Sequence, residues 1–95
     1  MIKTRKNLIE DALASVYSSD GKPRGQVEWL AIDLDSKWDN FKERSEDEER
    51  QFGDSPEETF QYLVHMLIWN WYSGGGTAEI AAKKVIAAVQ EQEVA

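Results

Sequence analysis

The chain contains no cysteine, so disulfide bonds and thiolate metal sites are excluded. It also lacks an uninterrupted run of about 18 apolar residues, the length that a membrane-spanning helix needs. Residues 1–13 are basic at the start, but Glu10 and Asp11 interrupt the apolar run that a signal peptide requires. We therefore expect a soluble cytoplasmic protein.

Histidine is nearly as scarce, because His65 is the only one. A nucleophile–base pair would need a suitable neighbour for it, and neither the HExxH nor the Glu-x-x-His motif of metal-dependent sites occurs. Residues 33–35 begin like a calcium loop but lack its glycine and its later ligands. Residues 74–77, with Lys83 and Lys84 beyond them, lack the spacing of a phosphate-binding loop. We predict a protein that is not an enzyme and holds no cofactor or metal.

Charge is abundant and uneven, with a net value of −7 for the chain. Residues 1–24 carry a net charge of +2, residues 25–78 carry −8 and residues 79–95 carry −1. An acidic chain repels nucleic acid and favours a protein partner with a basic surface. The alternative is that the acidic residues only keep a small domain soluble.

Apolar residues recur with helical spacing in four stretches, approximately 4–18, 26–44, 55–73 and 77–91. No run alternates with the period of a strand over a useful length. We therefore predict an all-α fold, a small bundle of about four helices that forms one domain over residues 1–95. Short connections favour an up-down arrangement of the helices.

Local signals mark the start of the last two helices. Ser55 is placed to cap the third helix, with Pro56 at its first position and Glu58 completing a capping box. Residues 74–76 are glycines that end this helix, and Thr77 is placed to cap the fourth. Residues 45–54 are compatible either with an extension of the second helix or with an acidic loop.

The third helix has two apolar faces. Tyr62, Met66 and Trp69 lie opposite a stripe that has the spacing of a core face, made of Phe60, Leu63, Val64, Leu67 and Trp71. Trp29 and Ile32 are likewise displaced from the apolar stripe of the second helix. Three explanations stay open for these five side chains: cover within the monomer, self-association, or a partner or small ligand. The third helix is accordingly expected to be central or to lie at an interface.

The acidic segment supplies a second candidate contact surface. Its partner-binding carboxylates are predicted to be Glu28, Asp35, Asp39, Glu43, Glu46, Asp47, Glu48 and Glu49. Carboxylates at i and i+4 on a helix lie about 6 Å apart along its axis, which is comparable with the phosphate spacing of a nucleic-acid strand. In size and charge the chain resembles small acidic inhibitors encoded by phages and other mobile elements, including some anti-CRISPR and anti-restriction proteins. We hypothesise a non-enzymatic protein that occupies a basic surface and mimics nucleic-acid charge.

Two alternatives belong to other functional classes. One is an oligomer that binds a nucleotide-like anion in pockets between subunits. Aromatic residues of the third helix and basic residues near Tyr17 would form these pockets, the basic residues being Lys3, Arg5, Lys6, Lys22 and Arg24. The other is a structural subunit whose second apolar face meets a fixed partner.

Overall fold

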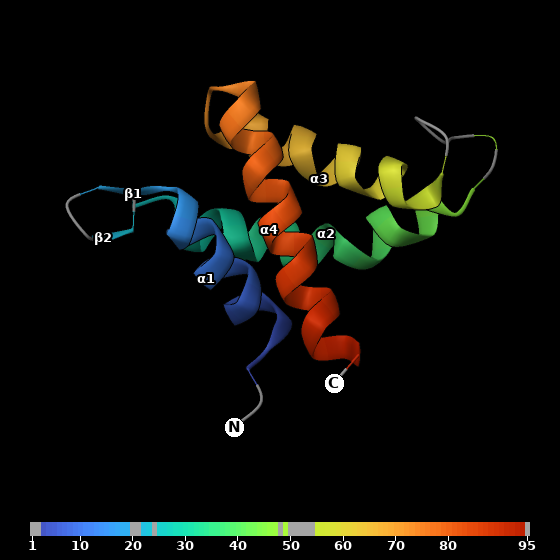
Figure 1. Cartoon of the computed structure of the whole chain (residues 1–95), viewed down its shortest axis with the longest axis horizontal. Coiled ribbons are helices and arrows are strands. Elements are labelled where there is room, and N and C mark those ends of the chain that lie inside the picture. Colours follow the sequence, from blue (N-terminus) through green and yellow to red (C-terminus); the bar gives the residue numbers. More distant parts are fainter. Residues whose placement is uncertain (1–2, 20–21, 24, 48, 50–54, 95) are drawn as a thin grey trace.

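The computed structural model describes residues 3–19, 22–23, 25–47, 49 and 55–94, and it is an all-α fold, as predicted. Its helices, drawn in Figure 1, are α1 (Arg5–Val16), α2 (Val27–Ser45), α3 (Pro56–Trp71) and α4 (Gly75–Val94). A minimal antiparallel hairpin of β1 (Ser18–Ser19) and β2 (Lys22–Pro23) joins α1 to α2. Within the described ranges, no helix is long and apolar enough to cross a membrane.

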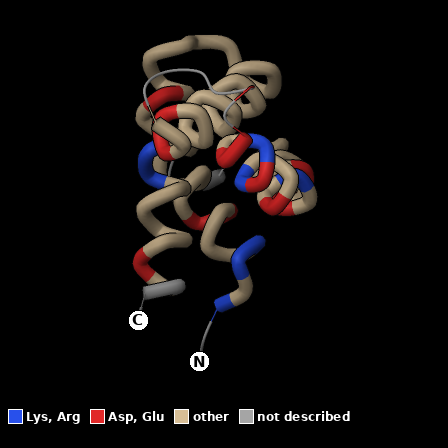
Figure 2. Tube along the Cα trace, turned by 90° about the vertical axis from the view of Figure 1, so that its right-hand side faces the viewer, with Lys and Arg blue, Asp and Glu red and all other residues tan. Residues whose placement is uncertain are grey.

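The four helices form two antiparallel pairs, α1 with α4 and α2 with α3, and the two pairs cross each other. α1 packs against α2 and α4, and α3 packs against the same two helices. In Figure 1, α2 and α3 run across the view whereas α1 and α4 run steeply, and Figure 2 shows α2 and α3 nearly end-on. This differs from the expected up-down arrangement. Alanines on the buried side of α4, Ala78, Ala81 and Ala82, allow it to lie close against its neighbours at a crossing angle.

The core lies between the two pairs and contains most of the predicted stripe residues. Trp38 of α2 is 2% exposed and meets the edge of Phe60 of α3, with 4.9 Å between ring centroids. The core face of α3 is wider than the predicted stripe, because Ile68 and Tyr72 are also buried. A helix flanked by two others buries more than one stripe, and these residues follow Val64 at i+4 and i+8.

The helix ends agree with the sequence at α3 and differ at α4. Ser55 caps α3 as predicted, and its Oγ accepts a hydrogen bond of 3.2 Å from the Glu58 amide. Helix α4 begins at Gly75 rather than after Thr77, so Thr77 lies inside the first turn and is not the cap. Gly74 instead provides the break, since its φ of 110° is open mainly to glycine.

The C-terminal end of α2 settles part of the ambiguity over residues 45–54. The helix ends at Ser45, and Glu46 is its C-cap. Residues 48 and 50–54 lie outside the described part of the chain, so the prediction for them stays open.

Candidate functional site

A basic side chain of α1 holds two of the predicted partner-binding carboxylates. Arg5 donates from Nε to Asp35 Oδ1 at 2.6 Å and from Nη1 to Asp39 Oδ1 at 2.8 Å. Partial burial lowers the pKa of the Arg5 guanidinium, but the hydrogen bonds and charges of both carboxylates outweigh that effect and raise the pKa above its ordinary value. Asp35 is 31% exposed in its side chain whereas Asp39 is 85% exposed, so Asp39 is much the more accessible of the two.

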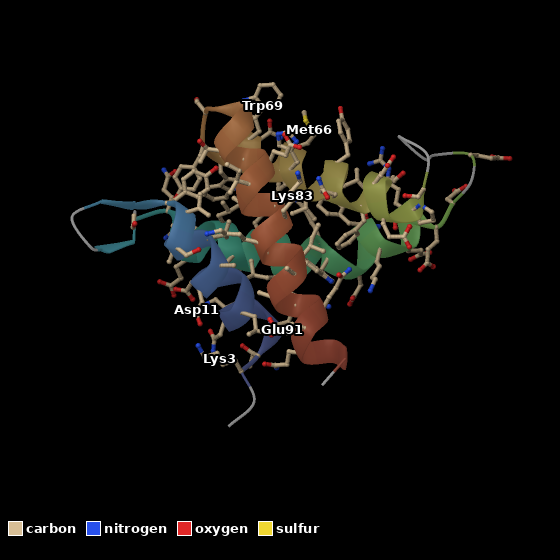
Figure 3. All side chains as sticks on the ribbon, in the orientation of Figure 1. Lys3, Asp11, Met66, Trp69, Lys83 and Glu91 are labelled. Carbon is tan, nitrogen blue, oxygen red and sulfur yellow. The ribbon has the colours of Figure 1, made fainter. Side chains whose placement is uncertain are left out.

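Lys6 of α1, and Lys3 just before the helix, also face acidic neighbours. Lys6 donates to Glu10 at 2.9 Å and lies 3.9 Å from Glu28, and the hydrogen bond to Glu10 is the main reason that the pKa of Lys6 is raised. Lys3 pairs with Asp11 at the same end of the molecule (Figure 3). Both lysines therefore lie beside carboxylates, and of the two only Lys6 also approaches α2.

The predicted anion-binding corner around Tyr17 does not present that ring to a ligand. Tyr17 is 4% exposed and stacks on Tyr72 with 4.2 Å between ring centroids. Arg5 is already held by two carboxylates of α2. Arg24 and the side chain of Lys22 lie outside the described residues.

Asp33 and Asp35 make contacts with different partners. Asp33 accepts a hydrogen bond of 3.1 Å from Trp71 Nε1 and lies 2.9 Å from the Lys37 ammonium, whereas Asp35 faces Arg5. Partial burial raises the pKa of Asp33, but the hydrogen bonds from Lys37 and Trp71 together lower it below its usual value. Among the described residues, no cluster of acidic or histidine side chains could hold a metal ion.

The outward side of α2 joins exposed apolar and acidic residues in one line. Trp29 is 64% exposed and Ile32, one turn later, is 43% exposed. At 100° per residue, Ser36, Asp39 and Glu43 continue the same side of the helix toward its C-terminus. We call these five residues the α2 face: its first two residues are apolar and its last two are acidic.

A shallow hollow adjoins the acidic end of the α2 face. Its volume is about 250 Å³. Its lining is polar and mainly acidic, from Asn40, Glu43, Arg44, Glu46 and Asp47. The hollow is open to solvent and has the size and charge to admit a lysine or arginine side chain of another protein.

The second apolar face of α3 is also uncovered. Tyr62 is 44% exposed, Trp69 is 46% exposed and Met66 between them is half-buried. Figure 3 shows Met66 and Trp69 projecting outward from α3 on one side. His65 stacks on Trp69 with 5.9 Å between ring centroids. We call Tyr62, Met66 and Trp69 the α3 face. α3 therefore buries one side against α2 and α4 and leaves the α3 face exposed.

The sequence did not reveal one further feature, a hollow of about 350 Å³ where α2, α3 and α4 meet. Phe60 and Ile86 give it an apolar part, while Lys42, Gln61 and Gln90 give it polar edges. Three helices contribute its lining, so no local pattern in one segment could have shown it.

The structure thus separates the predicted site residues into groups. Glu43, Glu46 and Glu49 are exposed and Asp47 is half-buried, while Glu28 and Asp35 face α1. Glu48 lies outside the described residues. The apolar residues divide between two faces, Trp29 and Ile32 on α2, and Tyr62, Met66 and Trp69 on α3. No protein-family model, curated protein or solved structure matches the chain.

Proposed function

We propose that this protein is not an enzyme and acts by binding the basic surface of another protein through the α2 face. The observation that carries the proposal is the position of Trp29. Among the described residues, it is the most exposed large apolar side chain, at 64%, and it lies in line with the acidic end of its own helix.

The apolar end of the α2 face supplies affinity. Tryptophan is enriched among the few residues that dominate binding energy at protein interfaces. Burial of the exposed parts of Trp29 and Ile32 would remove apolar surface that the folded monomer leaves in water. The core does not need either side chain, because Leu30, Ala31 and Leu34 already fill the buried side of α2.

The acidic end of the α2 face attracts and orients a partner with a basic surface. Asp39 and Glu43 lie one turn apart, and Glu46 and Glu49 continue the acidic surface beyond the helix. Arg5 contacts both Asp35 and Asp39, but the Asp35 side chain is only 31% exposed whereas that of Asp39 is 85% exposed, so Asp39 alone of the two belongs to this surface. Complementary charge speeds association and orients the partner. The finer form of the proposal is an inhibitor that fills a nucleic-acid-binding groove, with Asp39, Glu43, Glu46 and Glu49 in the place of phosphates.

Affinity capture from cell extract tests the proposal when it is done with matched charge reversals. Glu43→Lys changes the acidic end of the α2 face, and Glu91→Lys makes the same change of charge on α4. We expect wild type and Glu91→Lys to retain the same basic protein, and Glu43→Lys to lose most of it. Retention should fall as salt rises, because exposed charges are screened. Equal retention by the two variants at every salt concentration would contradict the proposal.

A further inference from the structure

The α3 face lies in a stretch that contains no charged residue. From Thr59 to Ala78 the chain carries no Asp, Glu, Lys or Arg, and its one titratable base, His65, is counted as neutral at pH 7, although the whole protein has a net charge of −7. Figure 2 shows the uncharged turn between α3 and α4 at one end of the molecule. The nearest charged pair on α4, Lys83 and Glu79, is 3.5 Å apart and neutral in sum. An exposed aromatic face without charge is thus present on an acidic protein.

We propose that the α3 face binds a second copy of this chain and forms a twofold-symmetric dimer. Two copies repel each other wherever their acidic surfaces meet, and they approach at the lowest electrostatic cost through an uncharged face. A basic partner would find few carboxylates there to match its charges. This inference is independent of the proposed function, which concerns the α2 face.

The spacing of the α3 face suits antiparallel pairing of α3 with its copy. In a twofold-symmetric contact, if residue i of the first copy lies against residue j of the second, then residue j of the first copy lies against residue i of the second. If Tyr62 of one copy lies against Trp69 of the other, His65 and Met66 fall at the twofold axis and also face each other. Both aromatic side chains are then covered, and His65 keeps its stack on Trp69.

The same register places Glu58, one of the two carboxylates in the first turn of α3, at a favourable position. Glu58, in the first turn of α3, comes opposite Ser73 and the start of α4 in the other copy. The first turn of a helix has backbone N–H groups without partners inside the helix and attracts negative charge. The contact therefore brings no carboxylate against another carboxylate.

The expected dimer is small and weak. A contact along α3, which has 16 residues, is about 24 Å long and about 10 Å wide. Such a contact falls below about 1,200 Å² of total buried surface, the lower limit of stable interfaces. We therefore expect a dissociation constant in the range of tens to hundreds of micromolar. Added salt should strengthen the dimer, because it screens the repulsion between two acidic copies.

Sedimentation of the full chain over a wide concentration range tests the dimer, with two tryptophan variants as a matched pair. Trp69→Gln removes an aromatic ring from the α3 face, and Trp29→Gln removes one from α2. We expect wild type to show a monomer–dimer equilibrium. The dissociation constant of the dimer should be unchanged in Trp29→Gln and at least tenfold larger in Trp69→Gln. A strict monomer at about 1 mM, or loss of the dimer in Trp29→Gln alone, would overturn the inference.

The absence of cysteine permits a second test that does not depend on affinity. Met66→Cys places one thiol next to the proposed twofold axis, and Asn40→Cys places one on exposed α2 surface. Under mild oxidation we expect Met66→Cys to form disulfide-linked dimers faster than Asn40→Cys. Equal rates for the two variants would contradict the antiparallel contact.

Discussion

Arg5 joins α1 to α2 through carboxylates on successive turns of α2. Its three nitrogens donate to Asp35 Oδ1, to Asp39 Oδ1 and to the Asp35 carbonyl at 2.6, 2.8 and 3.3 Å. A planar guanidinium can satisfy these acceptors together, which a lysine ammonium could not do in the same geometry. The consequence for function is that Asp35 is structural, while Asp39 stays exposed on the α2 face.

Replacement of Arg5 by glutamine should lower the free energy of unfolding by about 1 kcal/mol, since the interaction is bidentate but partly screened by solvent. Lys3→Gln is the matched control, because its pair with Asp11 is 59% exposed on both sides and should contribute little. Urea denaturation measures both variants. If Lys3→Gln lowered the free energy of unfolding as much as Arg5→Gln does, this account would be contradicted.

Asp33 gives the molecule a pH dependence of defined sign. Although burial raises the pKa of Asp33, hydrogen bonds from Lys37 and Trp71 lower it in the folded state. A depressed pKa contributes stability above the unfolded value of about 3.9, and that stability is lost as the pH falls through the folded value. Asp33→Asn should therefore cost about 1 kcal/mol at pH 7. The cost should shrink toward zero below about pH 4. Unfolding curves from pH 3 to 7 test this, and a constant difference would contradict it.

At the scale of elements, the helices were largely predictable and one junction was not. Ser55 and Pro56 carry a specific local signal, so the start of α3 was correctly placed. The three glycines before Thr77 look like a linker in the sequence. Only Gly74 adopts a conformation that needs glycine, whereas packing of Ala78 and Ala81 in the core extends α4 back over Gly75. Tertiary packing overrode the local preference there.

Ser55→Ala should reduce stability by about 1 kcal/mol, because the Glu58 amide loses its acceptor. Ser36→Ala is a control of the same chemistry in the middle of α2, where the Oγ only donates back to the Asp33 carbonyl. Alanine is a better helix former at such a position, so this variant should be neutral or slightly more stable. Thermal denaturation followed by circular dichroism compares them, and equal destabilisation would argue against a capping role.

The α3–α4 junction predicts effects of opposite sign at neighbouring glycines. Gly74→Ala should destabilise the protein by about 1 kcal/mol, because a side chain is strained at a φ of 110°. Gly76→Ala should stabilise it by roughly 0.5 kcal/mol, since Gly76 is helical and an added Cβ meets nothing within 4 Å. If both variants were destabilised equally in urea, α4 would not begin at Gly75.

At the scale of the whole molecule, the sequence predicted most of the large apolar residues that lack a place in the core. It missed Ile80, which is 55% exposed, and it did not show where these residues lie relative to one another. Trp29, Ile32, Tyr62 and Trp69 are exposed, so the monomer does not cover them. Periodicity gives the direction of a side chain on its own helix. It does not show which helices flank that helix, and so it could not reveal that Arg5 holds Asp35 or that Ile68 joins the core.

The two exposed faces respond to salt in opposite directions in this account. Binding through the α2 face joins opposite charges and weakens as salt rises, whereas contact through the α3 face joins like-charged molecules and strengthens. The two activities are therefore separable in one protein by salt alone, and by Trp29→Gln against Trp69→Gln.

The most direct test of the central claim is a titration of the captured basic protein with wild type, Trp29→Gln and Trp69→Gln. If Trp29 anchors the contact, Trp29→Gln should weaken binding by about 30-fold. Trp69→Gln should change the affinity less than about twofold. The affinity of wild type should decrease as the salt concentration is raised from about 50 to about 300 mM. If Trp29→Gln bound as tightly as wild type and binding did not depend on salt, the account would be contradicted.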